Sequence, residues 1–116
     1  MSAANGSAQP GALTIQIHAL GGRCTICLRG ELDMATAPDL ELAVNGLAPG
    51  VDDLVLDIEQ LSFMDSSGLH AILKAQDRCQ RAGSRFALTR GSAQVQRLFE
   101  LAGALDRLSV VEQQHT

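Results

Sequence analysis

Aromatic residues are scarce in this chain of 116 residues, which has no Trp, no Tyr and only three Phe. A hydrophobic core must therefore be built from Leu, Val, Ile and Ala, which the 46% hydrophobic content supplies. The same scarcity removes the aromatic platforms on which single-stranded nucleic acids stack. The net charge of −4 also opposes contact with a phosphate backbone. Both features argue against direct nucleic acid binding.

The sequence also lacks any apolar run long enough to span a bilayer. Its first 12 residues (MSAANGSAQPGA) have neither the basic start nor the apolar stretch of a signal peptide. We therefore expect a cytoplasmic protein with no membrane partner. The length suits one domain, and we expect a flexible N-terminal tail over 1–12, a folded domain over 13–111 and a C-terminal tail over 112–116.

Cysteine is limited to Cys24, Cys27 and Cys79. The C-x-x-C spacing of the first two is a pattern found in metal and redox sites. Both lie in an alternating segment that predicts a strand, however, and residues three apart on a strand point to opposite faces. No second Cys/His pair stands at zinc-finger spacing. We interpret all three as packing residues, and we expect no metal and no cofactor.

Apolar periodicity predicts an α/β fold. Alternation predicts strands at 13–17 and 24–28, joined by a tight turn at Gly21-Gly22 into an antiparallel hairpin. Helical spacing and capping residues predict three helices, which begin near Thr36, at Asp65 or Ser66, and at Ser92, and end at Pro49-Gly50, Gly83 and Gly103. Further strands are predicted at 54–58, 85–88 and 108–111. Right-handed strand–helix–strand connections then give one mixed sheet with packed helices.

The most informative segment is Met64-Asp65-Ser66-Ser67-Gly68-Leu69-His70, where a strand passes into a helix. Sites in parallel sheets form at the carboxyl ends of strands, and a helix N-terminus tolerates an attached phosphate. We interpret Gly68 as leaving room for another protein to approach the backbone.

Two other interpretations of this turn remain open. It is also a good helix cap with no further role. Ser66 is also a conceivable nucleophile with His70 four residues away, but the Gly-x-Ser-x-Gly pattern and an orienting carboxylate are not evident. A phosphate-binding Gly-x-x-x-x-Gly-Lys-Ser/Thr loop is likewise absent from the sequence. We therefore expect no enzymatic activity.

Three segments together resemble the STAS domain of the anti-sigma factor antagonist family. They are Gly30-Glu31-Leu32-Asp33, Asp65-Ser66-Ser67-Gly68-Leu69 and Gln96-Arg97-Leu98-Phe99, in the family's order and spacing. The resemblance extends from about Leu13 to Val111 and implies a single STAS-type domain. His70 departs from it, because family members often carry a small residue there, and the family's C-terminal helix is short or absent.

The resemblance implies a partner switch. The unphosphorylated antagonist binds an anti-sigma factor that is also a serine kinase, and a sigma factor is released. Phosphorylation of the serine directly after the aspartate, here Ser66, separates the complex, and a phosphatase resets it. The implied partner-binding residues are Asp33, Met64, Asp65, Ser66, Ser67, Gly68, Leu69 and His70. An alternative is a STAS docking subunit of a transport or signalling complex without sigma-factor control.

Overall fold

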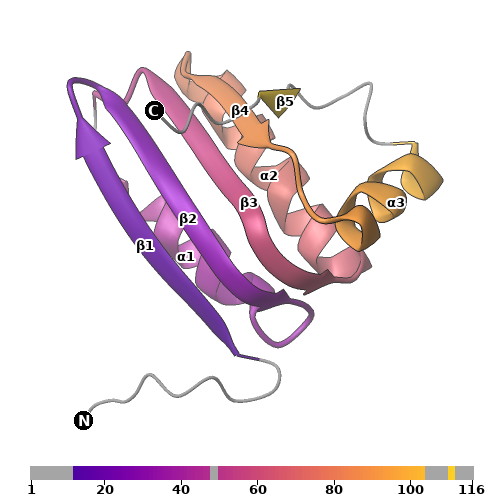
Figure 1. Cartoon of the computed structure of the whole chain (residues 1–116). Coiled ribbons are helices and arrows are strands. Elements are labelled where there is room, and N and C mark those ends of the chain that lie inside the picture. Colours follow the sequence, from indigo (N-terminus) through magenta and orange to yellow (C-terminus); the bar gives the residue numbers. More distant parts are fainter. Residues whose placement is uncertain (1–11, 48–49, 104–109, 112–116) are drawn as a thin grey trace, which may run out of the picture.

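The computed structural model describes residues 12–47, 50–103 and 110–111 (Figure 1). Its elements follow the predicted order of strands and helices. They are β1 (Leu13–Leu20), β2 (Arg23–Leu32), α1 (Ala37–Asn45), β3 (Asp53–Met64), α2 (Ser66–Ala82), β4 (Arg85–Thr89), α3 (Ala93–Ala102) and β5 (Val110–Val111).

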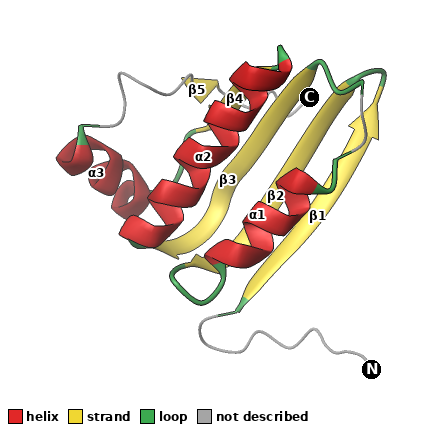
Figure 2. Cartoon of the chain, turned by 180° about the vertical axis from the view of Figure 1, so that it is seen from behind, coloured by secondary structure: helices red, strands yellow, loops and turns green. Residues whose placement is uncertain are grey.

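The strands form one mixed sheet in the order β1-β2-β3-β4-β5, so each strand lies beside the one before it in the chain. β1 and β2 are antiparallel, and the pairs from β2 to β5 are parallel. Connections of one hand place successive helices on the same face of such a sheet. Figure 2 shows this arrangement, with α1 and α2 lying side by side in front of the strands. The predicted α/β fold is confirmed.

The core lies between the sheet and these helices and is mainly aliphatic, with Phe86 and Phe99 as its aromatic members. Alternate residues of β2 and β3 point into it, among them Ile26, Leu56 and Ile58, which are all fully buried. α2 contributes a buried stripe that includes Leu69, Ile72 and Cys79. This packing satisfies the expectation that Leu, Val, Ile and Ala replace aromatic residues.

The two strands that lead to the motifs, β2 and β3, are longer than predicted, and β1 also runs on to Leu20. β2 continues through Gly30 and Glu31 to Leu32, and β3 continues to Met64. Shifts in the β2–β3 register between Cys27 and Arg29, and again between Gly30 and Glu31, interrupt the alternation on which the prediction relied. The longer strands place both sequence motifs, Gly30-Glu31-Leu32-Asp33 and Asp65-Ser66-Ser67-Gly68-Leu69, at the carboxyl ends of the parallel strands.

Other predicted boundaries differ less. α1 ends at Asn45 and not at Pro49-Gly50, because the N–H of Gly46 already caps it by donating to the carbonyl of Leu42 at 3.0 Å. The predicted last strand is described only at Val110–Val111. Leu108 and Ser109 lie outside the described residues, as do 1–11 and 112–116 of the predicted tails.

The cysteines are free thiols that do not form a pair. Cys24 and Cys79 are buried in the core, as predicted. Cys27 points to the opposite face of the sheet, is only half-buried, and donates its thiol hydrogen to Oδ2 of Asp57 at 3.8 Å. The predicted separation of Cys24 and Cys27 onto opposite faces of the strand is confirmed, and Cys27 packs outside the main core. Partial burial, followed by Asp57, raises the pKa of the Cys27 thiol.

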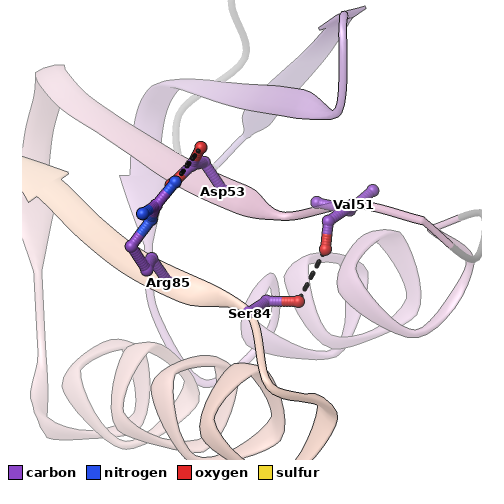
Figure 3. A network of polar contacts seen from close by, with 4 residues as sticks. All are labelled: Val51, Asp53, Ser84 and Arg85. Carbon is purple, nitrogen blue, oxygen red and sulfur yellow. Dashed lines mark hydrogen bonds and ion pairs between the residues drawn. The ribbon is translucent and has the colours of Figure 1, made fainter.

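Polar contacts join the starts of β3 and β4, at the end of the sheet away from the carboxyl ends of the strands (Figure 3). The Ser84 hydroxyl donates to the carbonyl of Val51 at 2.7 Å. The guanidinium of Arg85 binds the carboxylate of Asp53, its partner in the parallel register, with Nη2 3.0 Å from Oδ2. These hydrogen bonds hold the pKa of Asp53 below its usual value.

The Asp53–Arg85 pair predicts a pH-dependent effect. A carboxyl whose folded-state pKa is lowered stabilises the protein above its unfolded-state pKa of about 4, and the stabilisation is lost as the pH falls through the folded-state value. We expect Arg85→Ala to lower the melting temperature slightly at neutral pH, by an amount that shrinks in strong acid. A deficit of equal size at both pH values in thermal unfolding would contradict the assignment.

A second contact between β3 and β4 predicts a larger effect. The β3–β4 ladder ends at Leu56 and Leu88, and beyond it the buried hydroxyl of Thr89 accepts the N–H of Ile58 at 2.9 Å. Thr89→Val keeps the shape but leaves this N–H unsatisfied, so the free energy of unfolding should fall by about 1–3 kcal/mol. Urea unfolding measures the change. Thr14→Val, at an exposed strand position, is the control and should change stability by less than about 0.5 kcal/mol.

Candidate functional site

The candidate site lies where β2 and β3 end together. Leu32 and Met64 form the last pair of the parallel register, and Asp33 and Asp65 follow them directly. The N–H of Asp65 donates to the carbonyl of Leu32 at 3.2 Å. The two acidic residues of the separate sequence motifs therefore occupy equivalent positions on neighbouring strands.

Asp65 is the N-cap of α2. Its Oδ1 accepts the N–H of Gly68 at 3.1 Å, and its backbone is extended. This decides between the two caps that the sequence left open. Ser66 is then the first residue of the helix, and its side chain is exposed. The serine is therefore presented to solvent by a neighbour that performs the capping.

Asp33 organises the start of α1 in a similar way. Its Oδ1 accepts the N–H groups of Ala35 at 2.9 Å and Thr36 at 3.1 Å. The Thr36 hydroxyl donates to the carbonyl of Glu31 at 2.8 Å and ties this turn back to β2. Both carboxylates thus satisfy backbone donors at helix starts, which fixes their negative charge beside the first turns of α1 and α2.

The role predicted for Gly68 is wrong. Gly68 is buried, and a Cβ built on it would lie 2.5 Å from the carbonyl oxygen of Leu32 and 2.7 Å from Cγ of Met64. The space beside Gly68 is therefore occupied by this protein's own β2 and β3, and no partner approaches there. The glycine is needed because α2 begins in direct contact with the end of the sheet.

The predicted partner-binding residues divide into two groups. The side chains of Met64 and Leu69 belong to the core, at 1% and 7% exposure, and they hold the turn in place. Ser66 and His70 are exposed, and Ser67 is half-buried. The surface available to a partner is consequently narrower than the whole motif.

The exposed residues line an open depression of about 480 Å³ between α1 and α2. α2 contributes Ser66, Ser67 and His70, and the α1 side contributes Met34, Ala37, Pro38 and Glu41. The sequence motifs did not point to the residues of the α1 side. Their signal was indirect: two successive right-handed connections place α1 beside α2, so their first turns must border the same space. Met34 is 76% exposed and is the most prominent apolar side chain there.

A hydrolytic arrangement has little support in this depression. Ser66 and His70 both line it, but Asp33 and Asp65 are engaged with backbone N–H groups. Glu41, the remaining carboxylate, pairs with Lys74 at 3.4 Å. No carboxylate among these three is seen to orient His70 as a catalytic base requires.

Among the described residues, no group of three or more His, Cys, Asp or Glu side chains is arranged to hold a metal ion. In the same part of the chain, no helix combines the length and apolarity needed to cross a membrane.

An α/β domain in which an Asp-Ser-Ser-Gly turn caps a helix at the carboxyl end of a strand is characteristic of one class of protein. The chain belongs to the STAS domain family, whose model matches residues 14–115. The anti-sigma-B factor antagonist of Staphylococcus aureus is 31% identical over 84 residues, which cover 72% of this chain and 78% of that protein.

Solved structures share the fold at low identity. An anti-sigma factor antagonist from Mycobacterium paratuberculosis superposes with a TM-score of 0.81 at 22% identity, covering 92% of both chains. The unphosphorylated anti-sigma factor antagonist SpoIIAA gives a TM-score of 0.70 at 23% identity, covering 88% of this chain and 90% of that one. The STAS fold and the resemblance to anti-sigma factor antagonists are thereby confirmed.

The contact between Gly68 and Leu32 predicts that Gly68→Ala destabilises the protein. The added methyl group meets a backbone carbonyl, which cannot rotate away, so α2 must shift, and the free energy of unfolding should fall by about 1–3 kcal/mol. Gly46→Ala is the matched control, because its Cβ meets nothing closer than 3.3 Å and its φ of −87° suits alanine. Equal stability of the two variants in urea unfolding would refute the role given to Gly68.

Proposed function

We propose that this protein is a phosphorylation-controlled antagonist of an anti-sigma factor, acting in the cytoplasm and without enzymatic activity of its own. In its unphosphorylated form it binds an anti-sigma factor that is also a serine kinase, and a sigma factor is released. Phosphorylation of Ser66 ends this binding, and a phosphatase restores it. The exposed position of Ser66, directly after the capping Asp65 and inside the α1–α2 depression, is the observation that carries the proposal.

The surroundings of Ser66 suit docking of a partner. Met34 and Pro38 offer apolar area on one side of the depression, and Ser67 and His70 offer polar groups on the other. Burial of exposed apolar area is a favourable contribution to association. Met34 and Ser66 line the same depression, so a partner seated in it contacts both. The two side chains therefore belong to one proposed interface.

A phosphate on Ser66 changes this surface electrostatically. It adds about −1.5 to −2 charges at neutral pH. The new charge stands beside Asp65 and shares the depression with Glu41. The N-terminus of α2 stabilises the phosphate within the protein itself, so the fold tolerates the modification. A partner that buries the group must desolvate it next to the Asp65 carboxylate, which weakens binding without any refolding.

The proposed phosphorylation of Ser66 predicts that the mass of the protein increases by one phosphate group when it is incubated with candidate anti-sigma factor kinases, ATP and Mg²⁺. Intact mass spectrometry detects it, and peptide mapping assigns the residue. Ser66→Ala should abolish the increase, whereas Ser67→Ala should retain it. Phosphate found on Ser67 alone would refute the choice of acceptor. Binding of a partner without any phosphate transfer would favour the docking-subunit alternative.

Substitution by an acid tests the electrostatic part separately. Ser66→Asp should bind the kinase roughly 5–150-fold more weakly than Ser66→Ala, which corresponds to a coupling of about 1–3 kcal/mol. Titration calorimetry measures both affinities. Ala93→Asp adds the same charge to the exposed first turn of α3, outside the depression, and should bind like the parent protein. Equal affinity of all the variants would contradict the switch.

A further inference from the structure

The outer edge of β1 is open. β1 is the first strand of the sheet, and no described segment pairs with its free side (Figure 1). Its pairing with β2 is continuous over all eight residues, without the register shifts that interrupt β2 and β3. Such a strand presents a regular row of backbone N–H and C=O groups on its free side, which is a template for another strand.

Protective features that soluble proteins place on edge strands are missing from β1. Edge strands are usually blunted by charged side chains, proline, a bulge or very short length. The sequence of β1, LTIQIHAL, contains no Lys, Arg, Asp, Glu or Pro, and its ladder with β2 has no bulge. It also exposes large apolar side chains, with Ile17 at 48% and Leu20 at 87%. By contrast, β5 at the other side of the sheet is described over only two residues.

We propose that two copies of this chain associate through β1, with the two strands antiparallel about a two-fold axis at Gln16. The pattern of residues around Gln16 is nearly symmetric. Ile15 and Ile17 flank it, Thr14 and His18 follow, and Leu13 and Ala19 come next. Antiparallel self-pairing centred on Gln16 places Ile15 of each copy opposite Ile17 of the other, and Thr14 opposite His18.

This register places apolar residues opposite apolar residues and polar residues opposite polar residues. Ile15 and Ile17 pair with Leu28 and Ile26 of β2, which are buried beneath the helices, so both lie on the helix-bearing face. Thr14, Gln16 and His18 lie on the opposite, polar face. Directly opposed residues of antiparallel strands share a face, so isoleucine meets isoleucine on one side and polar residues meet on the other.

A second copy fits this edge because the contact is self-complementary and closes. A two-fold interface brings the same strand from both copies together, so a chargeless strand places no like charges opposite each other. The axis stands perpendicular to the sheet, and both copies therefore carry their helices on the same side. The α1–α2 depression contains no β1 residue, so dimerisation leaves the proposed switch uncovered.

Light scattering of the full chain after size exclusion tests the association. The expected result is a species of twice the 12.2 kDa chain mass that dissociates on dilution. Cysteine cross-linking tests the register. In a Cys27→Ser background, which removes the thiol that lies opposite Gln16 on β2, Gln16→Cys should form a disulfide-linked dimer under oxidation. The double variant Thr14→Cys, His18→Cys should do the same in that background. Thr25→Cys is the control, because it lies on the same face but one strand inward, and it should not cross-link.

A charged residue introduced into β1 tests whether the edge of this strand is the contact surface. Ile17→Lys should raise the dimer dissociation constant by at least about tenfold while the circular dichroism spectrum stays unchanged. Leu42→Lys, at a 71% exposed position on α1, is the matched control and should remain dimeric. A protein that is monomeric at every concentration overturns the proposal. So does a dimer that neither cross-links at Gln16 nor responds to Ile17→Lys. Both results leave phosphorylation of Ser66 untouched.

Discussion

The contact between α2 and the end of β2 is the constraint on which the functional end of this protein depends. Because Gly68 has no side chain, the first turn of α2 rests directly against the carbonyl of Leu32 and the side chain of Met64. The N–H of Asp65 reaches the same carbonyl. Strand end, helix cap and neighbouring strand are therefore joined within a few residues. Asp65 and Gly68, on either side of the two serines, are thereby held in place, and Ser66 is exposed between them.

The polar groups at the carboxyl ends of β2 and β3 have both structural and electrostatic roles. Asp65 caps α2 and Asp33 holds the turn that precedes α1, and Asp65 also places negative charge beside the exposed serine. The proposed phosphorylation of Ser66 places its charge next to the Asp65 carboxylate, and on that proposal binding weakens without a change of fold. The aspartates cannot be replaced freely for a second reason, because each satisfies backbone N–H groups that would otherwise lack partners.

The two faces of the sheet have different characters. The helix-bearing face holds the core and the α1–α2 depression, whereas the other face carries polar contacts such as Cys27 with Asp57 and the Asp53–Arg85 pair. The free edge of β1 belongs to neither surface. An association through that edge and a partner in the depression are consequently compatible, because they use different residues and different sides of the molecule.

The amino-acid sequence by itself determined the order of the elements, the aliphatic core, the family and the serine at the start of α2. These follow from local periodicity, capping residues and motif spacing, which neighbouring residues control. Only the tertiary structure decided that β2 and β3 run on to Leu32 and Met64, that Gly68 packs inward and that Met34 borders Ser66. Each of these depends on contacts between segments distant in the chain, and such contacts leave no periodic signal in the sequence.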